Sequence, residues 1–87
     1  MDKELILKLF DTNGLDRAEA LLTPEAAQGD AWALYMLGRI SWKRGDKAGA
    51  ITLFTQAVAI DPASEAAVAL EQARTIMDFF NKDLYNP

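Results

Sequence analysis

Residues 34–62 read LYMLGRISWKRGDKAGAITLFTQAVAIDP, and this stretch decides the fold. It contains two segments of helical periodicity separated by Gly45, with the small residue Gly38 in the first and Ala50 in the second. Two helices joined by so short a turn lie antiparallel as neighbours, and small side chains let their backbones cross closely. Phe54 follows Ala50 by about one turn, so that a large and a small side chain can interdigitate. The stretch therefore predicts a closely packed helical hairpin.

Capping residues and helix breakers predict where the other helices begin and end. Asp30 and Asp46 are of the type that caps a helix N-terminus, and Asn13 or Gly14 suits the left-handed conformation that ends a helix. Thr23–Glu25 is expected to interrupt the second helix, because proline disfavours helical geometry in the residue before it. The sequence thus predicts an all-α fold of about five helices, over residues 2–10, 16–22, 31–44, 47–60 and 65–80.

The hairpin stretch resembles a tetratricopeptide repeat, a 34-residue helix pair in which W-x2-L-G-x2-Y, A-x3-F and a closing Pro recur at fixed offsets. The matching residues are Leu34-x2-Leu37-Gly38-x2-Ser41, Gly45, Ala50-x3-Phe54, Ala57 and Asp61-Pro62. Leu34 replaces the usual Trp, and Ser41 replaces the usual Tyr. The resemblance covers residues 31–64. It implies a right-handed stack of antiparallel helix hairpins that acts as a scaffold for binding another protein.

The resemblance also suggests how the rest of the chain is organised. Gly14 stands at a turn equivalent to that of Gly45, which makes the N-terminal segment resemble a shortened repeat. A last helix, capped by Ser64 or Asp61, resembles the additional helix that follows the final repeat of such arrays. The segment Phe80–Asp83 resembles the end of small stand-alone bacterial members of the family. We expect a single domain, residues 1–87, made of a degenerate hairpin (1–30), a full repeat (31–64), a capping helix (65–80) and a tail (81–87).

Composition argues against several classes of function. The chain has no cysteine and no histidine, which removes disulfides, thiolate or imidazole metal ligands and catalysis by either side chain. Its net charge is −4, whereas a nucleic-acid-binding protein needs a basic surface. No apolar run approaches the roughly 20 residues of a membrane span, and Met1–Glu4 does not resemble a secretory signal. We therefore expect a cytoplasmic protein that is not an enzyme and has no cofactor or metal. We also expect that it binds neither nucleic acid nor a membrane.

One face of the predicted third helix carries the candidate site. Trp32, Tyr35, Arg39 and Trp42 follow the spacing i, i+3, i+7, i+10, which places them on one side of a helix, and Lys43 adjoins them. In the family that the chain resembles, this face of the first helix lines the concave groove where ligands lie. Aromatic residues and arginine are favoured at interface hot spots. All five residues are therefore candidates for partner binding, with Arg39 available to an acidic or carboxylate group.

Three arrangements would bury this aromatic face. The N-terminal hairpin (residues 2–28), the last helix or the tail from Phe79 would cover it as part of the protein's own core. A peptide or protein segment of unidentified sequence would make it a binding site, and a second copy would make it a homodimer contact. The function expected is a non-catalytic protein–protein interaction module. The alternative is a structural, homo-oligomerising helical scaffold without a dedicated ligand.

Overall fold

The computed structural model describes the backbone of residues 1–85 and the side chains of residues 1–78. It contains five helices: α1 (Lys3–Asp11), α2 (Leu15–Ala27), α3 (Ala31–Lys43), α4 (Lys47–Ile60) and α5 (Glu65–Tyr85). The expected all-α fold of about five helices is confirmed.

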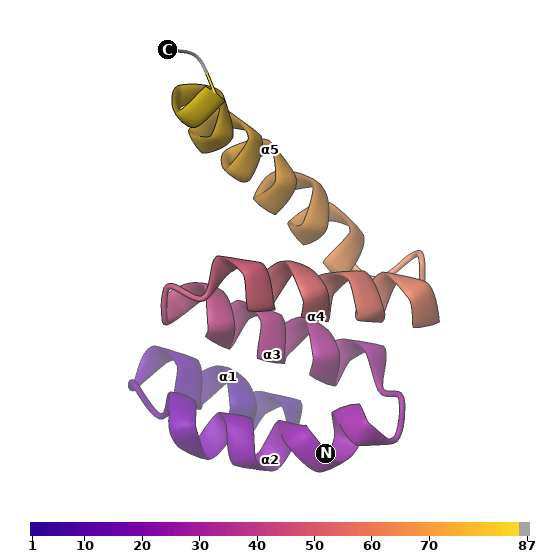
Figure 1. Cartoon of the computed structure of the whole chain (residues 1–87). Helices are drawn as coiled ribbons and strands as arrows, with labels where there is room; N and C mark the ends of the chain where they lie inside the picture. Colours follow the sequence, from indigo (N-terminus) through magenta and orange to yellow (C-terminus); the bar gives the residue numbers. More distant parts are fainter. Residues whose placement is uncertain (86–87) are drawn as a thin grey trace.

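The helices pack in chain order, each against the next, as expected for a stack of hairpins. Figure 1 shows α1 to α4 lying side by side in successive layers, while α5 leaves the end of α4 at a steep angle. The first part of α5 contacts α4 and also approaches α3. Beyond this contact α5 diverges from the other four helices (Figure 1). The right-handedness of the stack remains a prediction.

Local signals in the sequence set the turns. The carboxylates of Asp30 and Asp46 accept hydrogen bonds from the backbone N–H groups of Ala33 and Gly49, at 3.1 and 2.9 Å, and so cap α3 and α4. Gly45, at the α3–α4 turn, has a φ of 85°, a backbone conformation that glycine adopts without steric cost. Between α1 and α2 it is Asn13, with a φ of 60°, that takes the left-handed conformation. Of the two residues suggested by the sequence, Asn13 is the one used.

The core consists of three groups of buried side chains, each of which joins two or more helices. The first joins the N-terminal hairpin to α3 and the second joins α4 to α5, while the third joins α3, α4 and α5 at the far end of the hairpin. The members are Ile6, Leu9, Ala18, Leu22, Ala33, Met36 and Ile40 in the first, Ala50, Phe54, Leu70 and Ala73 in the second, and Leu34, Ala57 and Ala66 in the third. Small alanines thus occur at every crossing, which lets the helices approach closely.

The expected interruption of the second helix is wrong. Helix α2 runs unbroken from Leu15 to Ala27 with Pro24 inside it. Proline removes one backbone hydrogen bond, the one that its N–H would donate to the carbonyl of Ala20. Ala20, Thr23 and Pro24 are all exposed, so that water can reach this turn, and the Thr23 hydroxyl donates to the Glu19 carbonyl at 2.7 Å. The break is avoided because the lost bond lies near the end of the helix and on its solvent side.

The last helix is longer than the sequence suggested. We expected it to end near Phe80, followed by a tail from Asn81, whereas α5 extends to Tyr85. The reason is compositional, since neither glycine nor proline occurs between Glu65 and Asn86. At the start of this helix the Ser64 hydroxyl is buried and makes no hydrogen bond within the described part of the chain, so it does not act as the expected cap. The alternative cap, Asp61, accepts from the backbone N–H of Ala63 at 3.1 Å, which stabilises the turn before α5 and does not cap the helix.

Arg44, which follows α3, forms ion pairs with the N-terminal hairpin. Its guanidinium forms an ion pair with Asp16 and a second one, at 3.1 Å, with Glu19. Both acids lie on α2, so these two exposed ion pairs link the end of α3 to α2. No helix within the described residues is both long and apolar enough to cross a membrane.

Candidate functional site

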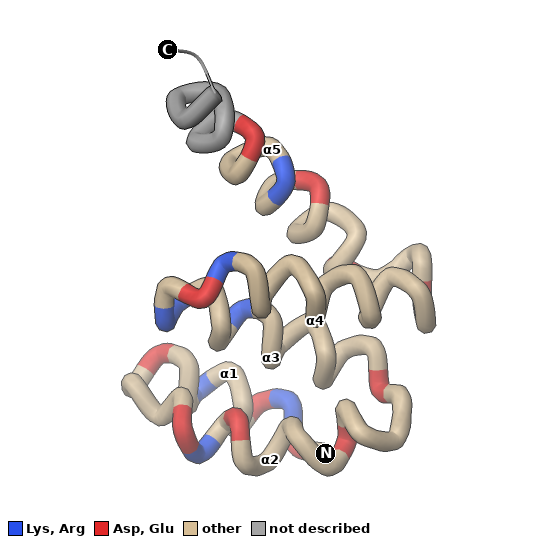
Figure 2. Tube along the Cα trace, viewed as in Figure 1, with Lys and Arg blue, Asp and Glu red and all other residues tan. Residues whose placement is uncertain are grey.

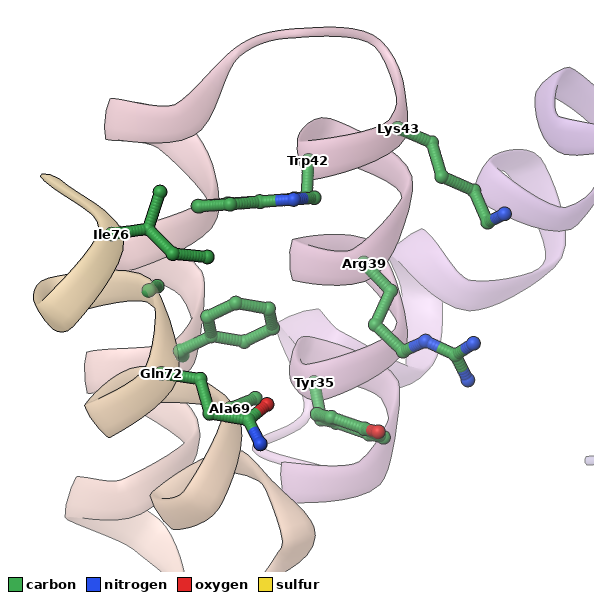
Figure 3. A pocket seen from close by; sticks show the side chains of 9 residues that line it. Tyr35, Arg39, Trp42, Lys43, Ala69, Gln72 and Ile76 are labelled. Carbon is green, nitrogen blue, oxygen red and sulfur yellow. The ribbon is translucent and has the colours of Figure 1, made fainter. Parts of the chain in front are cut away.

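A pocket of about 330 Å³ lies between α3 and α5. Four of the five candidate residues line it, together with one residue of α4 and four of α5. The lining consists of Tyr35, Arg39, Trp42 and Lys43 from α3, Phe54 from α4, and Ala69, Gln72, Ala73 and Ile76 from α5. Figure 3 shows Trp42 and Ile76 pointing into the space between α3 and α5, with Gln72 at its edge. The wall between these two helices is therefore mainly apolar.

Trp42 forms the part of the wall nearest the α3–α4 turn. It is half-buried and packs against the group of side chains that joins α4 to α5. The Lys47 ammonium lies 4.3 Å from the centre of the Trp42 ring, within the range of a cation–π interaction. The indole is thus supported from the core and from α4, while part of its surface remains open to the pocket.

Tyr35 marks the opposite end of the pocket. Its ring centre lies 6.0 Å from that of Phe54, with the planes tilted by 38°, a separation usual for packed aromatic pairs. Phe54 itself is buried, with 3% of its surface exposed. Its ring, with the side chains of α5, forms the floor between Tyr35 and Trp42. The sequence had suggested Phe54 only as a core residue.

The two cations of the site lie to one side of this apolar wall. In Figure 3 the side chains of Arg39 and Lys43 point away from α5, toward the N-terminal hairpin. The Arg39 guanidinium carbon lies 5.1 Å from the ring centre of Phe10 on α1 and 5.8 Å from that of Tyr35. Lys43 is exposed. The site therefore has an apolar part between α3 and α5 and a cationic part between α3 and α1.

Trp32, the fifth candidate, does not line the pocket. It is half-buried against the core group that joins the N-terminal hairpin to α3, and the Lys3 ammonium lies 4.9 Å from its ring centre. Of the covers considered from within the chain, the N-terminal hairpin (residues 2–28) packs against Trp32, and the last helix packs against part of Tyr35 and Trp42. Cover by the tail from Phe79 concerns side chains outside those that the structure describes.

Sequence reasoning missed the contribution of α5 to this site. Ala69, Gln72, Ala73 and Ile76 are spaced at i, i+3, i+4 and i+7, which places them on one helix face. This spacing was visible in the sequence, but nothing indicated that this face of α5 would lie opposite Trp42. Phe10 was also missed, because only the packing of α1 beside α3 brings it to Arg39. Within the described residues, no group of three or more acidic side chains is arranged to hold a metal ion.

Comparison with known proteins agrees with this architecture. The sequence profile described as "Tetratricopeptide repeat" matches residues 31–64, which comprise α3, α4 and the turn that follows. No curated protein and no solved structure matches the chain significantly. Repeats of this family generally serve as protein–protein interaction modules and are typically not catalytic. The resemblance read from the sequence is confirmed: residues 31–64 of this chain are a tetratricopeptide repeat.

Proposed function

We propose that this chain is a non-catalytic module that binds a segment of another protein on the concave face of α3, the face that carries Tyr35, Arg39 and Trp42. An apolar side chain of the partner occupies the pocket between α3 and α5, and an acidic group lies beside Arg39 and Lys43. The observation that carries this proposal is the composition of the pocket, in which an open aromatic wall adjoins two cations.

The apolar part supports the proposal through its accessibility. Trp42 is only half-buried and Ile76 is 40% exposed. Both line the pocket, which is large enough to hold a side chain, so a partner can reach them. Concave apolar pockets with a few polar groups at the edge are the usual form of a binding site. Tryptophan and tyrosine at such positions are the residue types that contribute most to protein–protein affinity.

The charge distribution supports an acidic partner. The nine residues that line the pocket include two cations and no acid, although the whole chain carries a net charge of −4. Figure 2 shows basic residues at the end of α3 and the start of α4, with the acidic Asp46 in the turn that joins them. A local positive region on an acidic protein favours association with a complementary negative segment.

Selection from a random peptide library displayed on phage tests this proposal directly. The wild-type chain is expected to enrich peptides that contain both a large apolar residue and Asp or Glu. Ile76→Glu, which places an acid in the apolar wall, is expected to abolish binding of the enriched peptides. Val68→Glu is the matched control, because Val68 is exposed on the same helix but does not line the pocket. Absence of enrichment, or equal binding by both variants, would refute the proposal.

The alternative, a homo-oligomerising scaffold without a dedicated ligand, is favoured by one observation. Val68 is 62% exposed on α5, close to Ile76 along the same helix, which leaves apolar surface uncovered. Sedimentation velocity over a wide range of protein concentrations distinguishes the two proposals. Self-association that Val68→Glu weakens would support the oligomer, while a monomer at all concentrations would exclude it.

The cytoplasmic location and bacterial origin expected from the sequence remain predictions.

A further inference from the structure

The guanidinium of Arg39 lies near two aromatic rings that belong to different helices. Phe10, in the last turn of α1, is 5.1 Å away, and Tyr35, one turn earlier on α3, is 5.8 Å away. The third contact is a hydrogen bond from Nη1 of Arg39 to Sδ of Met36, at 3.8 Å. All three contacts are uncharged groups. Arg39 is therefore held by uncharged groups, and none of its contacts among the described side chains is a carboxylate.

The absence of an acidic partner sets Arg39 apart from Arg44. Within the described side chains, Arg44 pairs with two acids, whereas no carboxylate lies within 4.0 Å of Arg39. Cation–π contacts restrict the positions of a guanidinium and leave its N–H groups able to donate to another acceptor. A cation that is already ordered loses less conformational freedom when a carboxylate binds. Arg39 thus has the properties of a prepared anion contact.

Phe10 supplies the part of this arrangement that α3 cannot supply by itself. Tyr35 and Met36 are fixed on the same helix as Arg39, whereas Phe10 reaches it from the N-terminal hairpin. We infer that Phe10 is a positioning residue, which holds Arg39 beside the pocket and thereby sets the preference of the site for an acidic group. The inference rests on the proposed function, because it assigns the charge selectivity of the same site.

The contrast with Lys43 indicates which cation dominates the preference. Lys43 is exposed, so its flexible ammonium must be ordered when it binds an anion. Arg39 is half-buried and presents a planar fork that matches a carboxylate. The acid preference is therefore expected to depend more on Arg39, and on the ring that positions it, than on Lys43.

The test measures the binding of two peptides by fluorescence anisotropy: the most enriched library peptide, and the same peptide with each Asp or Glu replaced by its amide. The ratio of their dissociation constants reports acid preference separately from general binding. We expect the wild-type chain to prefer the acidic form about tenfold, as one charge-assisted hydrogen-bonded contact would give. Arg39→Gln is expected to remove this preference.

Phe10→Leu keeps an apolar side chain but removes the ring, and is expected to reduce the preference to about twofold while the amide peptide binds as before. Phe10→Tyr retains the ring and is expected to restore the full preference. Leu5→Ala is the matched control, since Leu5 packs against the same core from α1 and makes no aromatic contact with Arg39. This variant is expected to lower the melting temperature without changing the ratio.

Each outcome separates the two proposals. If the wild-type chain binds no peptide, the proposed function fails. If the preference depends on Arg39 but is the same in Phe10→Leu, the proposed function stands and the role of Phe10 is refuted. Should Phe10→Leu fail to fold, the Arg39 Nε–Hε resonance of the wild-type chain gives a second measurement. A ring-current displacement of that resonance is expected, and a position typical of exposed arginine would refute the inference.

Discussion

Gly38 on α3 and Phe54 on α4 are in such close contact that no other residue fits at position 38 without movement. A Cβ atom at Gly38 would lie 2.5 Å from Cε1 and 2.6 Å from Cδ1 of the Phe54 ring, closer than side-chain carbons approach one another. The ring cannot withdraw freely, because Phe54 is 3% exposed and also contacts Tyr35. This pair fixes the distance between α3 and α4, and with it the floor of the pocket.

Gly38→Ala should therefore destabilise the protein even though alanine favours a helix. Overpacking of a core costs about 1–3 kcal/mol, against a gain of about 1 kcal/mol in helix propensity. We expect a net loss of about 1 kcal/mol in the free energy of unfolding, measured by urea denaturation. The cost should shrink in a Phe54→Leu background, where the ring is absent. An equal cost in both backgrounds would show that the contact is not responsible.

The cap of α4 gives a second prediction. The Asp46 carboxylate accepts a hydrogen bond from the Gly49 N–H at 2.9 Å. Asp46→Ala removes this bond and is expected to lower the free energy of unfolding by about 1 kcal/mol. Asp46→Asn retains an oxygen acceptor and should remain close to the wild-type stability in the same denaturation experiment. Equal losses in the two variants would argue for a role of the charge instead of the cap.

Pro24 provides a prediction in the opposite direction. Because α2 passes through this residue unbroken, Pro24→Ala restores a backbone donor and removes the clash of the proline ring with the preceding turn. The unfolded chain becomes more flexible, which offsets about 0.4–1 kcal/mol of the gain. We expect a net stabilisation of about 1–2 kcal/mol, seen as a higher urea midpoint. A lower midpoint would mean that the proline stabilises the turn before Gly29.

The two tryptophans should have different roles in binding. Trp42 lines the pocket, whereas Trp32 packs against the N-terminal hairpin and Lys3. Trp42→Leu is expected to weaken the binding of the enriched peptide about tenfold or more, as loss of an aromatic anchor does. Trp32→Leu is expected to lower the melting temperature and leave the dissociation constant nearly unchanged. Equal loss of affinity in the two variants would require a binding surface that reaches the N-terminal hairpin.

The sequence predicted the ends of the helices well where they depend on nearby residues. It predicted them less well where they depend on solvent exposure or on neighbouring helices. Asp30, Asp46 and Gly45 act within one turn of the chain, so their effect could be read from residue type and spacing alone. Pro24 was misread because its effect depends on whether water reaches the turn, and this depends on which side of α2 faces outward. The end of α5 was placed too early for a different reason: the segment after Phe80 contains no glycine or proline before Pro87, so nothing in its composition ends the helix there.

The pairing of α3 with α4 was determined by the sequence itself, because Gly38, Gly45 and Phe54 act over short distances and at fixed helical spacing. The division of the aromatic face was decided only by the tertiary structure. Periodicity places Trp32 and Trp42 on the same side of one helix, but it does not specify what packs against each end. The N-terminal hairpin covers the first, and the steep angle of α5 leaves the second beside an open pocket. Helix packing angles depend on side chains distant in the chain, which no local pattern records.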